Sequence, residues 1–182
     1  DHPVAREIRC GFPFVVTHAG NLGFYGAWET VIQAAKLLDG GDIGFVFIGD
    51  GAAKSQLEAL ADGCRRVRFL PFRPLEEVPC VLAAGDIHIV TIRRGVEGMV
   101  VPSKLYPILA AGRPVLAVVP ETSDVARIVT QSGCGVVADP DDPYAVATAI
   151  RGLFGDHNRL EQMAHHARAV ALEYECQEQV ER

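Results

Sequence analysis

The chain has 182 residues, of which 49% are hydrophobic and 22% charged, so it is long enough for one domain with a sizeable core and short for two. Its formal net charge is -6 and its basic residues are scattered, which argues against a nucleic-acid or anionic-membrane surface. No apolar run approaches membrane-spanning length. The start, Asp1-His2-Pro3, lacks an initiator Met and a signal peptide, so we expect a fragment or processed product.

The cysteines and histidines do not predict a metal site. The five cysteines include no Cys-x-x-Cys pair, so we expect no disulfide framework and mostly small buried residues of a reduced, cytosolic protein. His165 and His166 are adjacent on a predicted helix and point about 100 degrees apart, so they cannot clamp one ion. We expect both to be solvated.

Strand and helix patterns alternate along the chain. Short β-branched or aromatic runs predict strands at 14–17, 44–48, 67–70, 87–91, 115–119 and 135–137. Helical periodicity predicts helices at 28–38, 54–61, 75–84, 103–111, 123–131 and 144–153, then a polar terminal helix from about residue 157. The strands are continuous apolar runs, as in a parallel sheet that helices cover on both faces. We therefore predict an α/β fold with one doubly wound, Rossmann-like domain over residues 1–182.

Such sheets bind ligands beyond the carboxyl ends of their strands, so the loops at those ends are the candidate site. After the first strand, Gly20, Gly23 and Gly26 let the backbone turn tightly and approach a ligand. The turn at 49–51 follows the second strand and is interpreted as structural, because most glycine turns only reverse the chain. Segments 71–74 and 93–95 follow the third and fourth strands. Four such loops on one edge predict a cleft.

The stretch EGMVVPSKLYPILAAGRPV, residues 97–115, places an acid, a glycine turn and a Ser-Lys pair directly before a helix. The unpaired N–H groups at the start of that helix can bind an anion, Ser103 can cap it, and Lys104 can neutralise negative charge. Taken alone, the stretch is equally compatible with a polar loop before an ordinary amphipathic helix. Together with the other loops, it favours a site for a phosphorylated ligand.

The glycine loop does not match the dinucleotide fingerprint. Its glycines are spaced G-x-x-G-x-x-G rather than G-x-G-x-x-G, and Asp42 lies before the second strand instead of at its end. Asp50 is at a strand end but lies within its own glycine turn. An NAD-dependent oxidoreductase is therefore the weaker alternative.

Six segments in order resemble the C-terminal, nucleotide-sugar-binding domain of GT-B glycosyltransferases, in the large retaining group called family 4. They are GNLG, FVFIGDG, VRFLPF, AAGDIHIV, EGMVVPSKLY with LAAGRPVLA, and GCGVVADPDDPYAVATAI. Within them, VPSKLY is similar to a bacterial subgroup that builds surface polysaccharides. The resemblance covers nearly the whole chain, and it implies one half of a GT-B fold.

The resemblance implies a UDP- or GDP-linked sugar as donor substrate, with no metal and no cofactor. It also implies a cytoplasmic, retaining, metal-independent parent enzyme, in which the donor phosphate helps to deprotonate the acceptor. The acceptor-binding N-terminal domain is expected to be absent from these 182 residues, and through it the parent enzyme would be peripheral at the membrane. The isolated domain is then expected to bind donor without transferring sugar.

Roles for single residues follow from the same resemblance. The donor diphosphate would be approached by the loop formed by Gly20, Asn21, Leu22 and Gly23. The nucleobase would be held at Pro71, Phe72 and Arg73. Glu97 would accept hydrogen bonds from hydroxyls of the donor sugar, helped by the backbone N–H groups of Gly98, Met99 and Val100, and the phosphates would face Ser103 and Lys104.

The chain departs from the family pattern at two positions. Pro107 stands where similar enzymes have a second glutamate that binds ribose, and Tyr25 stands where a diphosphate-gripping lysine is expected. One hypothesis is that Lys104, with Arg93 or Arg94, supplies the missing charge; the equally supported alternative is that the two arginines are simply solvated at their loop. The alternatives are a degenerate, non-catalytic nucleotide-binding or interaction domain, and a fragment of a GT-B-like nucleotide-sugar epimerase, which fits EGMVVPSK less well.

Overall fold

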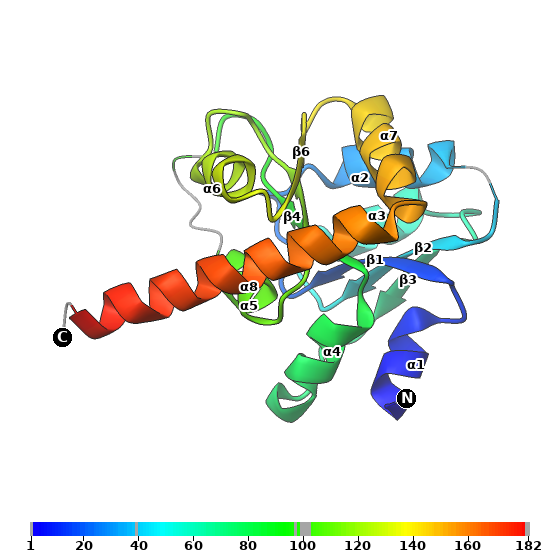
Figure 1. Cartoon of the computed structure of the whole chain (residues 1–182). Helices are drawn as coiled ribbons and strands as arrows, with labels where there is room; N and C mark the ends of the chain where they lie inside the picture. Colours follow the sequence, from blue (N-terminus) through cyan, green and yellow to red (C-terminus); the bar gives the residue numbers. More distant parts are fainter. Residues whose placement is uncertain (1, 39, 97, 99–102, 181–182) are drawn as a thin grey trace.

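The computed structural model describes residues 2–38, 40–96, 98 and 103–180, the last six of these by backbone alone. Its strands form one parallel sheet in the order β3-β2-β1-β4-β5-β6 (Figure 1). Because the order reverses between β1 and β4, the sheet is doubly wound and the predicted Rossmann-like fold is confirmed. The strands are β1 (Phe14–Ala19), β2 (Ile43–Ile48), β3 (Val67–Leu70), β4 (Ile87–Thr91), β5 (Val115–Val118) and β6 (Gly135–Ala138).

After the first helix, helices follow the strands, and the helices depart from the prediction by more than one residue in three places. A short first helix has no predicted counterpart, since seven residues give little periodicity. The helix predicted at 75–84 divides into a 3-10 turn and an α-helix. The helix expected from Ser103 begins at Leu105. The helices are α1 (Pro3–Arg9), α2 (Trp28–Leu37), α3 (Lys54–Leu60), η1 (Leu75–Glu77), α4 (Val78–Ala84), α5 (Leu105–Ala110), α6 (Asp124–Ser132), α7 (Pro143–Phe154) and α8 (His157–Val180).

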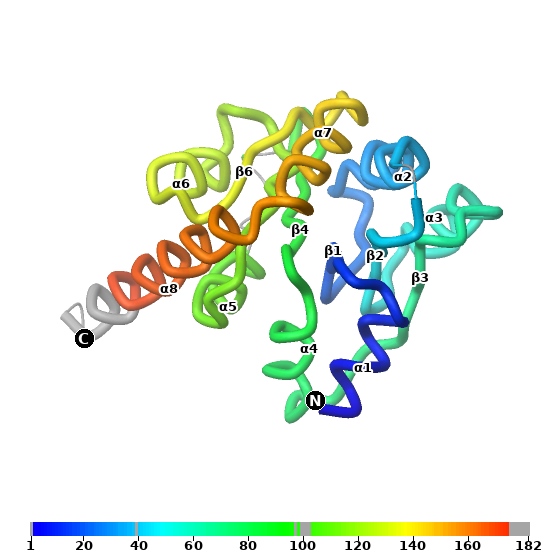
Figure 2. The backbone as a smooth tube through the Cα atoms, turned by 45° about the vertical axis from the view of Figure 1, so that its right-hand side comes forward, coloured from blue at the N-terminus to red at the C-terminus, as the bar shows by residue number. Residues whose placement is uncertain are grey.

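Alternate residues of each strand point to opposite faces of the sheet, and both faces are buried. Phe45 and Phe47 pack in a cluster with residues of α2, α3 and α7, whereas Val46 and Ile48 pack with α1 and α4. On the other half of the sheet, β5 packs against α5 and α6. The long helix α8 joins the two layers, because Met163 belongs to one cluster and Ala167 to the other (Figure 2). Helices therefore cover both faces, which explains the continuous apolar strands.

The cysteines are less buried than expected. Of the four whose side chains are described, only Cys134 is in the core, while Cys10, Cys64 and Cys80 are half-buried at the ends of helices or in turns, and all four are free thiols. His165 and His166 are exposed, as predicted. Within the described ranges, no helix is long and apolar enough to cross a membrane, and no cluster of three metal-ligating side chains occurs.

Candidate functional site

The glycine loop after β1 is hydrogen-bonded to the turn after β2. Gly20 donates its backbone N–H to the Ile48 carbonyl at 2.8 Å, and Leu22 donates to the Asp50 carbonyl at 2.8 Å. The two segments touch so closely that a Cβ on Gly49 would lie 2.0 Å from the Gly20 carbonyl oxygen. The turn at 49–51 therefore supports the glycine loop, which agrees with its interpretation as structural.

Two aromatic side chains hold the same loop from within the domain. Trp28, the first residue of α2, donates its indole N–H to the Gly23 carbonyl at 2.6 Å. Tyr25, the residue found in place of the expected lysine, donates its hydroxyl to the Asn21 carbonyl at 3.0 Å. The backbone N–H groups of Asn21 and Gly23 make no hydrogen bond to another described residue. The loop is thus fixed through two of its N–H groups and through the Asn21 and Gly23 carbonyls, and the N–H groups of Asn21 and Gly23 remain for an acceptor such as a phosphate oxygen.

Lys104 reaches the glycine loop from the start of α5. Its Nζ lies 2.8 Å from Nε2 of His18 and 2.9 Å from the Asn21 carbonyl oxygen. The stem crosses Gly20 so closely that a Cβ there would be 2.9 Å from Lys104 Cε. Burial lowers the pKa of Lys104 to about 8, so the amine still carries its charge at neutral pH. The structure therefore brings together the loop and the lysine that the sequence indicated separately.

His18 is a residue of this site that the sequence analysis missed. It lies near the end of β1, is 2% exposed, and its ring contacts Trp28 edge-on at a centroid distance of 4.7 Å. Burial, and then the charge of Lys104, lowers the pKa of His18 to about 3. The available signal was a polar residue within an apolar strand, immediately before the glycine loop.

A cavity of about 230 Å³ opens beside Lys104 and Gly20. Its walls come from the ends of β1 and β2, from β4, from the loop after β3, and from α4 and the start of α5. Most of the lining is apolar, and none of the described lining residues is acidic. They are Ala19, Gly20, Ile48, Phe72, Arg73, Val78, Val81, Leu82, His88, Ile89, Lys104, Pro107 and Ile108. The cavity suits a flat, largely apolar group attached to an anion at the lysine.

The three residues predicted to hold the nucleobase in the loop after β3 differ in how they meet the cavity. Phe72 lines the cavity and is 57% exposed, so its ring is free to meet a ligand. Arg73 also lines the cavity, but it forms ion pairs with Glu7 of α1 and, at 3.7 Å, with Glu77 of η1. Pro71 does not line the cavity. Phe72 is therefore the residue of this loop that is available to contact a ligand, while the charge of the Arg73 guanidinium is largely neutralised.

Pro107 is compatible with α5 because of where the helix begins. It is the third residue, and the first four N–H groups of a helix have no partner within it, so the missing proline N–H costs no hydrogen bond. Lys104 is the N-cap residue and no described side chain caps this helix, so the expectation that Ser103 caps it is wrong. Ser103 is exposed. Pro107 lines the cavity without offering a hydrogen-bond acceptor from its side chain.

Residues 9–156 match the family described as glycosyl transferases group 1. The chain belongs to this family. It is 38% identical over 133 residues to the probable glycosyltransferase WbjE of Pseudomonas aeruginosa, covering 72% of this chain and 33% of that protein. It is 32% identical over 149 residues to the putative colanic acid biosynthesis glycosyl transferase WcaI of Escherichia coli K12, covering 79% and 37%. The chain thus spans about a third of the length of these curated relatives.

Solved structures of other glycosyltransferases have the same fold. The catalytic domain of the cholesterol-alpha-glucosyltransferase of Helicobacter pylori matches with a TM-score of 0.75 at 15% identity, over 89% of this chain and 99% of that one. Anabaena HepE, solved in complex with UDP and glucose, matches with a TM-score of 0.74 at 20% identity, over 95% and 48%. At these identities the likeness shows the fold alone.

The arginines after β4 do not complete the cation set of this glycosyltransferase domain. Arg94 pairs at 2.8 Å with both Asp139 and Asp141, in the loop after β6, and is therefore neutralised. Arg93 donates its backbone N–H to the Tyr25 carbonyl at 2.7 Å and exposes its side chain. Arg94 is thus committed to this pairing rather than available beside Lys104, and Lys104 is the cation that the described loops bring to the glycine turn.

Part of the predicted donor site has no described placement. Glu97, Met99 and Val100 lie outside the described residues of this glycosyltransferase domain, whereas Gly98 is described and exposed. Their roles toward a donor sugar remain predictions from the family resemblance.

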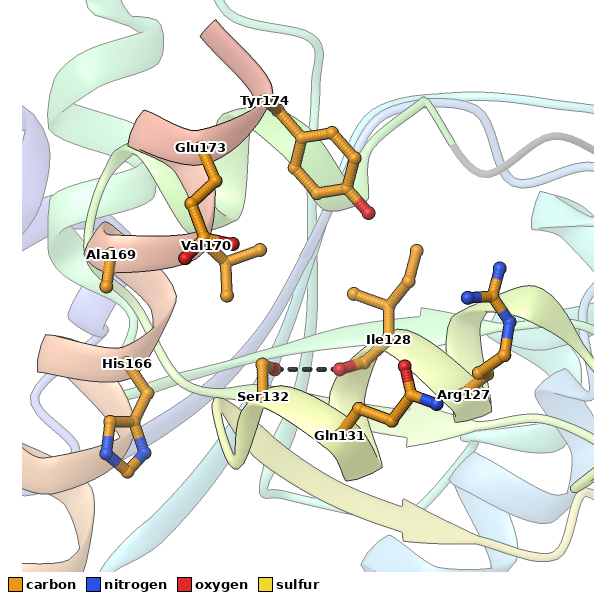
Figure 3. A pocket seen from close by; sticks show the side chains of 9 residues that line it. All are labelled: Arg127, Ile128, Gln131, Ser132, His166, Ala169, Val170, Glu173 and Tyr174. Carbon is orange, nitrogen blue, oxygen red and sulfur yellow. Dashed lines mark hydrogen bonds between the residues drawn. The ribbon is translucent and has the colours of Figure 1, made fainter. Parts of the chain in front are cut away.

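A second hollow of about 400 Å³ lies between α6 and α8, away from the loops after the strands (Figure 3). The side chains that line it come from these two helices only, and the hydrogen bond drawn there, from the Ser132 hydroxyl to the Ile128 carbonyl at 2.7 Å, closes a turn within α6. It contains no glycine loop and no lysine. The cavity beside Lys104 is therefore the stronger candidate for the donor site of the glycosyltransferase domain.

Proposed function

We propose that the chain is the nucleotide-sugar donor-binding half of a retaining, metal-independent glycosyltransferase that acts in bacterial surface polysaccharide synthesis. The observation that carries this proposal is the Lys104 ammonium, fixed 2.9 Å from the Asn21 carbonyl of the glycine loop and beside an apolar cavity. A nucleoside diphosphate has the complementary shape, with a flat base and sugar next to an anion.

The same arrangement suits the chemistry of sugar transfer. As the bond from sugar to diphosphate breaks, negative charge gathers on the leaving diphosphate, and a fixed cation with fixed backbone dipoles stabilises it without a metal. In this proposal the free N–H groups of Asn21 and Gly23 and the Lys104 ammonium receive the diphosphate. Phe72 receives the base, and Glu97 positions the donor sugar.

The rest of the parent enzyme enters the proposal through its relatives. WcaI is described as a colanic acid biosynthesis glycosyl transferase, and HepE was solved with UDP and glucose. Because this chain spans about a third of such relatives, we place acceptor binding and catalysis in a two-domain cytoplasmic enzyme, of which these residues form the donor half. The isolated chain is then expected to bind donor without transferring sugar.

Calorimetric titration with UDP, GDP, ADP, dTDP and NAD tests the proposal. We expect UDP or GDP to bind equally well with and without EDTA, and Lys104→Ala to weaken that binding about 10-fold or more, because a hydrogen bond to a charged group is lost. Lys36→Ala, an exposed lysine in the last turn of α2, is the matched control and should bind like the wild type. Binding of NAD alone would overturn the proposal, whereas no binding of any nucleotide would favour a degenerate domain, the alternative that Pro107 and Tyr25 support.

A further inference from the structure

Lys104 is the cation of the proposed donor site, and its nearest polar contact is a histidine from the neighbouring strand. We propose that His18 is a positioning residue, which fixes the Lys104 ammonium at the glycine loop in the place where it meets the donor diphosphate. This inference rests on the proposed function. It assigns a task to a buried side chain that is not itself expected to touch the ligand.

The contacts of His18 define which ring nitrogen carries the proton. Nδ1 lies 3.3 Å from the Ile89 carbonyl oxygen of β4. A carbonyl can only accept, so Nδ1 is the protonated nitrogen and Nε2 presents a lone pair. That lone pair faces Lys104 Nζ at 2.8 Å and accepts one of its N–H bonds. The β4 backbone thus sets the tautomer in which His18 can hold the lysine.

The imidazole ring is buried and packed between aromatic side chains, so we infer that it determines where the lysine lies. It is 2% exposed and packs edge-on against Trp28 and, at 6.5 Å, against Phe47. Trp28 also donates a hydrogen bond to the Gly23 carbonyl, so the same side chain supports both the His18 ring and the glycine loop. A lysine side chain otherwise rotates freely about the bonds of its four-carbon stem. Fixing it before the ligand arrives removes an entropic cost from binding.

Two of the three ammonium donors of Lys104 are occupied, by Nε2 of His18 and by the Asn21 carbonyl. No described residue accepts from the third, which in this inference is left for a ligand. The absence of a side chain at Gly20 gives the lysine stem room to pass, since a Cβ there would lie 3.1 Å from Nζ. The His18 ring therefore holds the ammonium at the glycine loop, and the missing side chain of Gly20 lets the lysine stem reach that place.

A histidine suits this position better than a carboxylate would. The pKa of His18 is lowered to about 3 by burial and by Lys104, so the ring is neutral when the lysine is charged. A neutral acceptor orients the ammonium without cancelling the charge that attracts a diphosphate. The other charged or titratable described residues of the cavity are committed elsewhere, because Arg73 pairs with two glutamates and His88 donates from Nε2 to the Leu82 carbonyl at 2.8 Å.

A double-mutant cycle on UDP affinity, measured by calorimetry on the full 182-residue chain, tests the inference. His18→Phe keeps the ring packing and removes the acceptor, and we expect it to weaken UDP binding about 10-fold. In the Lys104→Met background the same change should have no further effect, since a residue that acts through Lys104 has nothing left to position. His18→Gln, whose side-chain carbonyl can accept from Lys104, should restore most of the affinity. If His18→Phe does not fold, His18→Met replaces it in the cycle.

The pH profile supplies a readout that a merely structural role would not move. UDP affinity of the wild type should fall as the pH rises through about 8 and Lys104 loses its charge. Without the acceptor at His18 the ammonium is less stabilised, so the fall should come at lower pH in His18→Phe and return to the wild-type position in His18→Gln. Equal losses for His18→Phe in both lysine backgrounds, with an unmoved profile, would overturn the inference while leaving the proposed function intact. Absence of UDP and GDP binding by the wild type would overturn both.

Discussion

Single glycines allow the loops at the carboxyl edge to touch. Gly49 has a φ of +145°, a conformation that side chains rarely adopt, and its α carbon faces the Gly20 carbonyl at the junction of two loops. That contact aligns the glycine loop on which Lys104 is held. The glycine pattern could be predicted from the sequence, since it follows the strands. His18 could not, because its role depends on a contact with Lys104, 86 residues away in the chain.

Gly49→Ala should destabilise the domain strongly, because its Cβ would lie 2.0 Å from the backbone oxygen of Gly20 and one loop must move. We expect the free energy of unfolding to fall by about 3 kcal/mol, of which roughly 1–2 kcal/mol is the cost of the backbone conformation. Gly63→Ala is the matched control, since its φ is +74° and no atom lies within 4 Å of the added carbon. Urea denaturation of both variants makes the comparison, and equal losses would contradict the loop contact.

At the scale of elements, α5 depends on α8. This six-residue helix carries Lys104 at its N-cap and Pro107 in its first turn, yet no side chain caps its start. The terminal helix supports it, because Arg168 donates from Nη1 to the Ala110 carbonyl at 2.6 Å and Tyr174 meets Tyr106 edge-on at 5.1 Å. The long terminal helix was predictable from periodicity, and the strands from their continuous apolar runs. The start of α5 was not, since a serine before the helix resembles a cap whether or not it forms one.

Replacing Pro107 tests whether the cavity lacks a hydrogen-bond acceptor for the ribose. Glutamate is well tolerated as the third residue of a helix, and in Pro107→Glu its carboxylate would line the cavity as a new acceptor. On the proposed function, the wild type should bind UDP and 2′-deoxy-UDP within about 3-fold of each other, since an apolar site discriminates weakly against a hydroxyl. Pro107→Glu should raise the preference for UDP about 10-fold, and Pro107→Ala should not. A wild type that already prefers UDP 10-fold would show that another group binds the ribose.

For the whole molecule, the topology explains which predictions hold. Strand-helix alternation and largely apolar strands indicate a parallel sheet with both faces covered, so the order of elements already implied which loops share an edge. Details that depend on surface pairing were not readable from the sequence. Arg94 was expected near the cleft but pairs with Asp139 and Asp141, which lie about 45 residues further along the chain.

Stability of the whole domain should fall in mild acid because two histidines are buried uncharged. Burial lowers the pKa of His18 to about 3 and that of His88 to about 4, against 6.5 for an ordinary histidine. Between about pH 4 and 6.5 the unfolded chain therefore binds more protons than the folded one, so stability rises with pH and is lost as the pH falls. From pH 7 to 5 we expect a loss of about 2 kcal/mol per histidine.

The window from pH 7 to 5 separates this effect from the carboxylates, since the pKa values of Glu7 and Asp139 are held below 4.5 and 3.8 by their hydrogen-bond donors and neighbouring arginines. Urea denaturation at pH 7, 6 and 5 measures the loss in the free energy of unfolding. His88→Gln removes one titrating ring and should reduce the acid loss by about half, even where it lowers stability at pH 7. His165→Gln, an exposed histidine, should leave the loss unchanged. A stability that stays constant between pH 7 and 5 would mean that the two buried rings are protonated without unfolding, and a protonated His18 could no longer accept a hydrogen bond from Lys104.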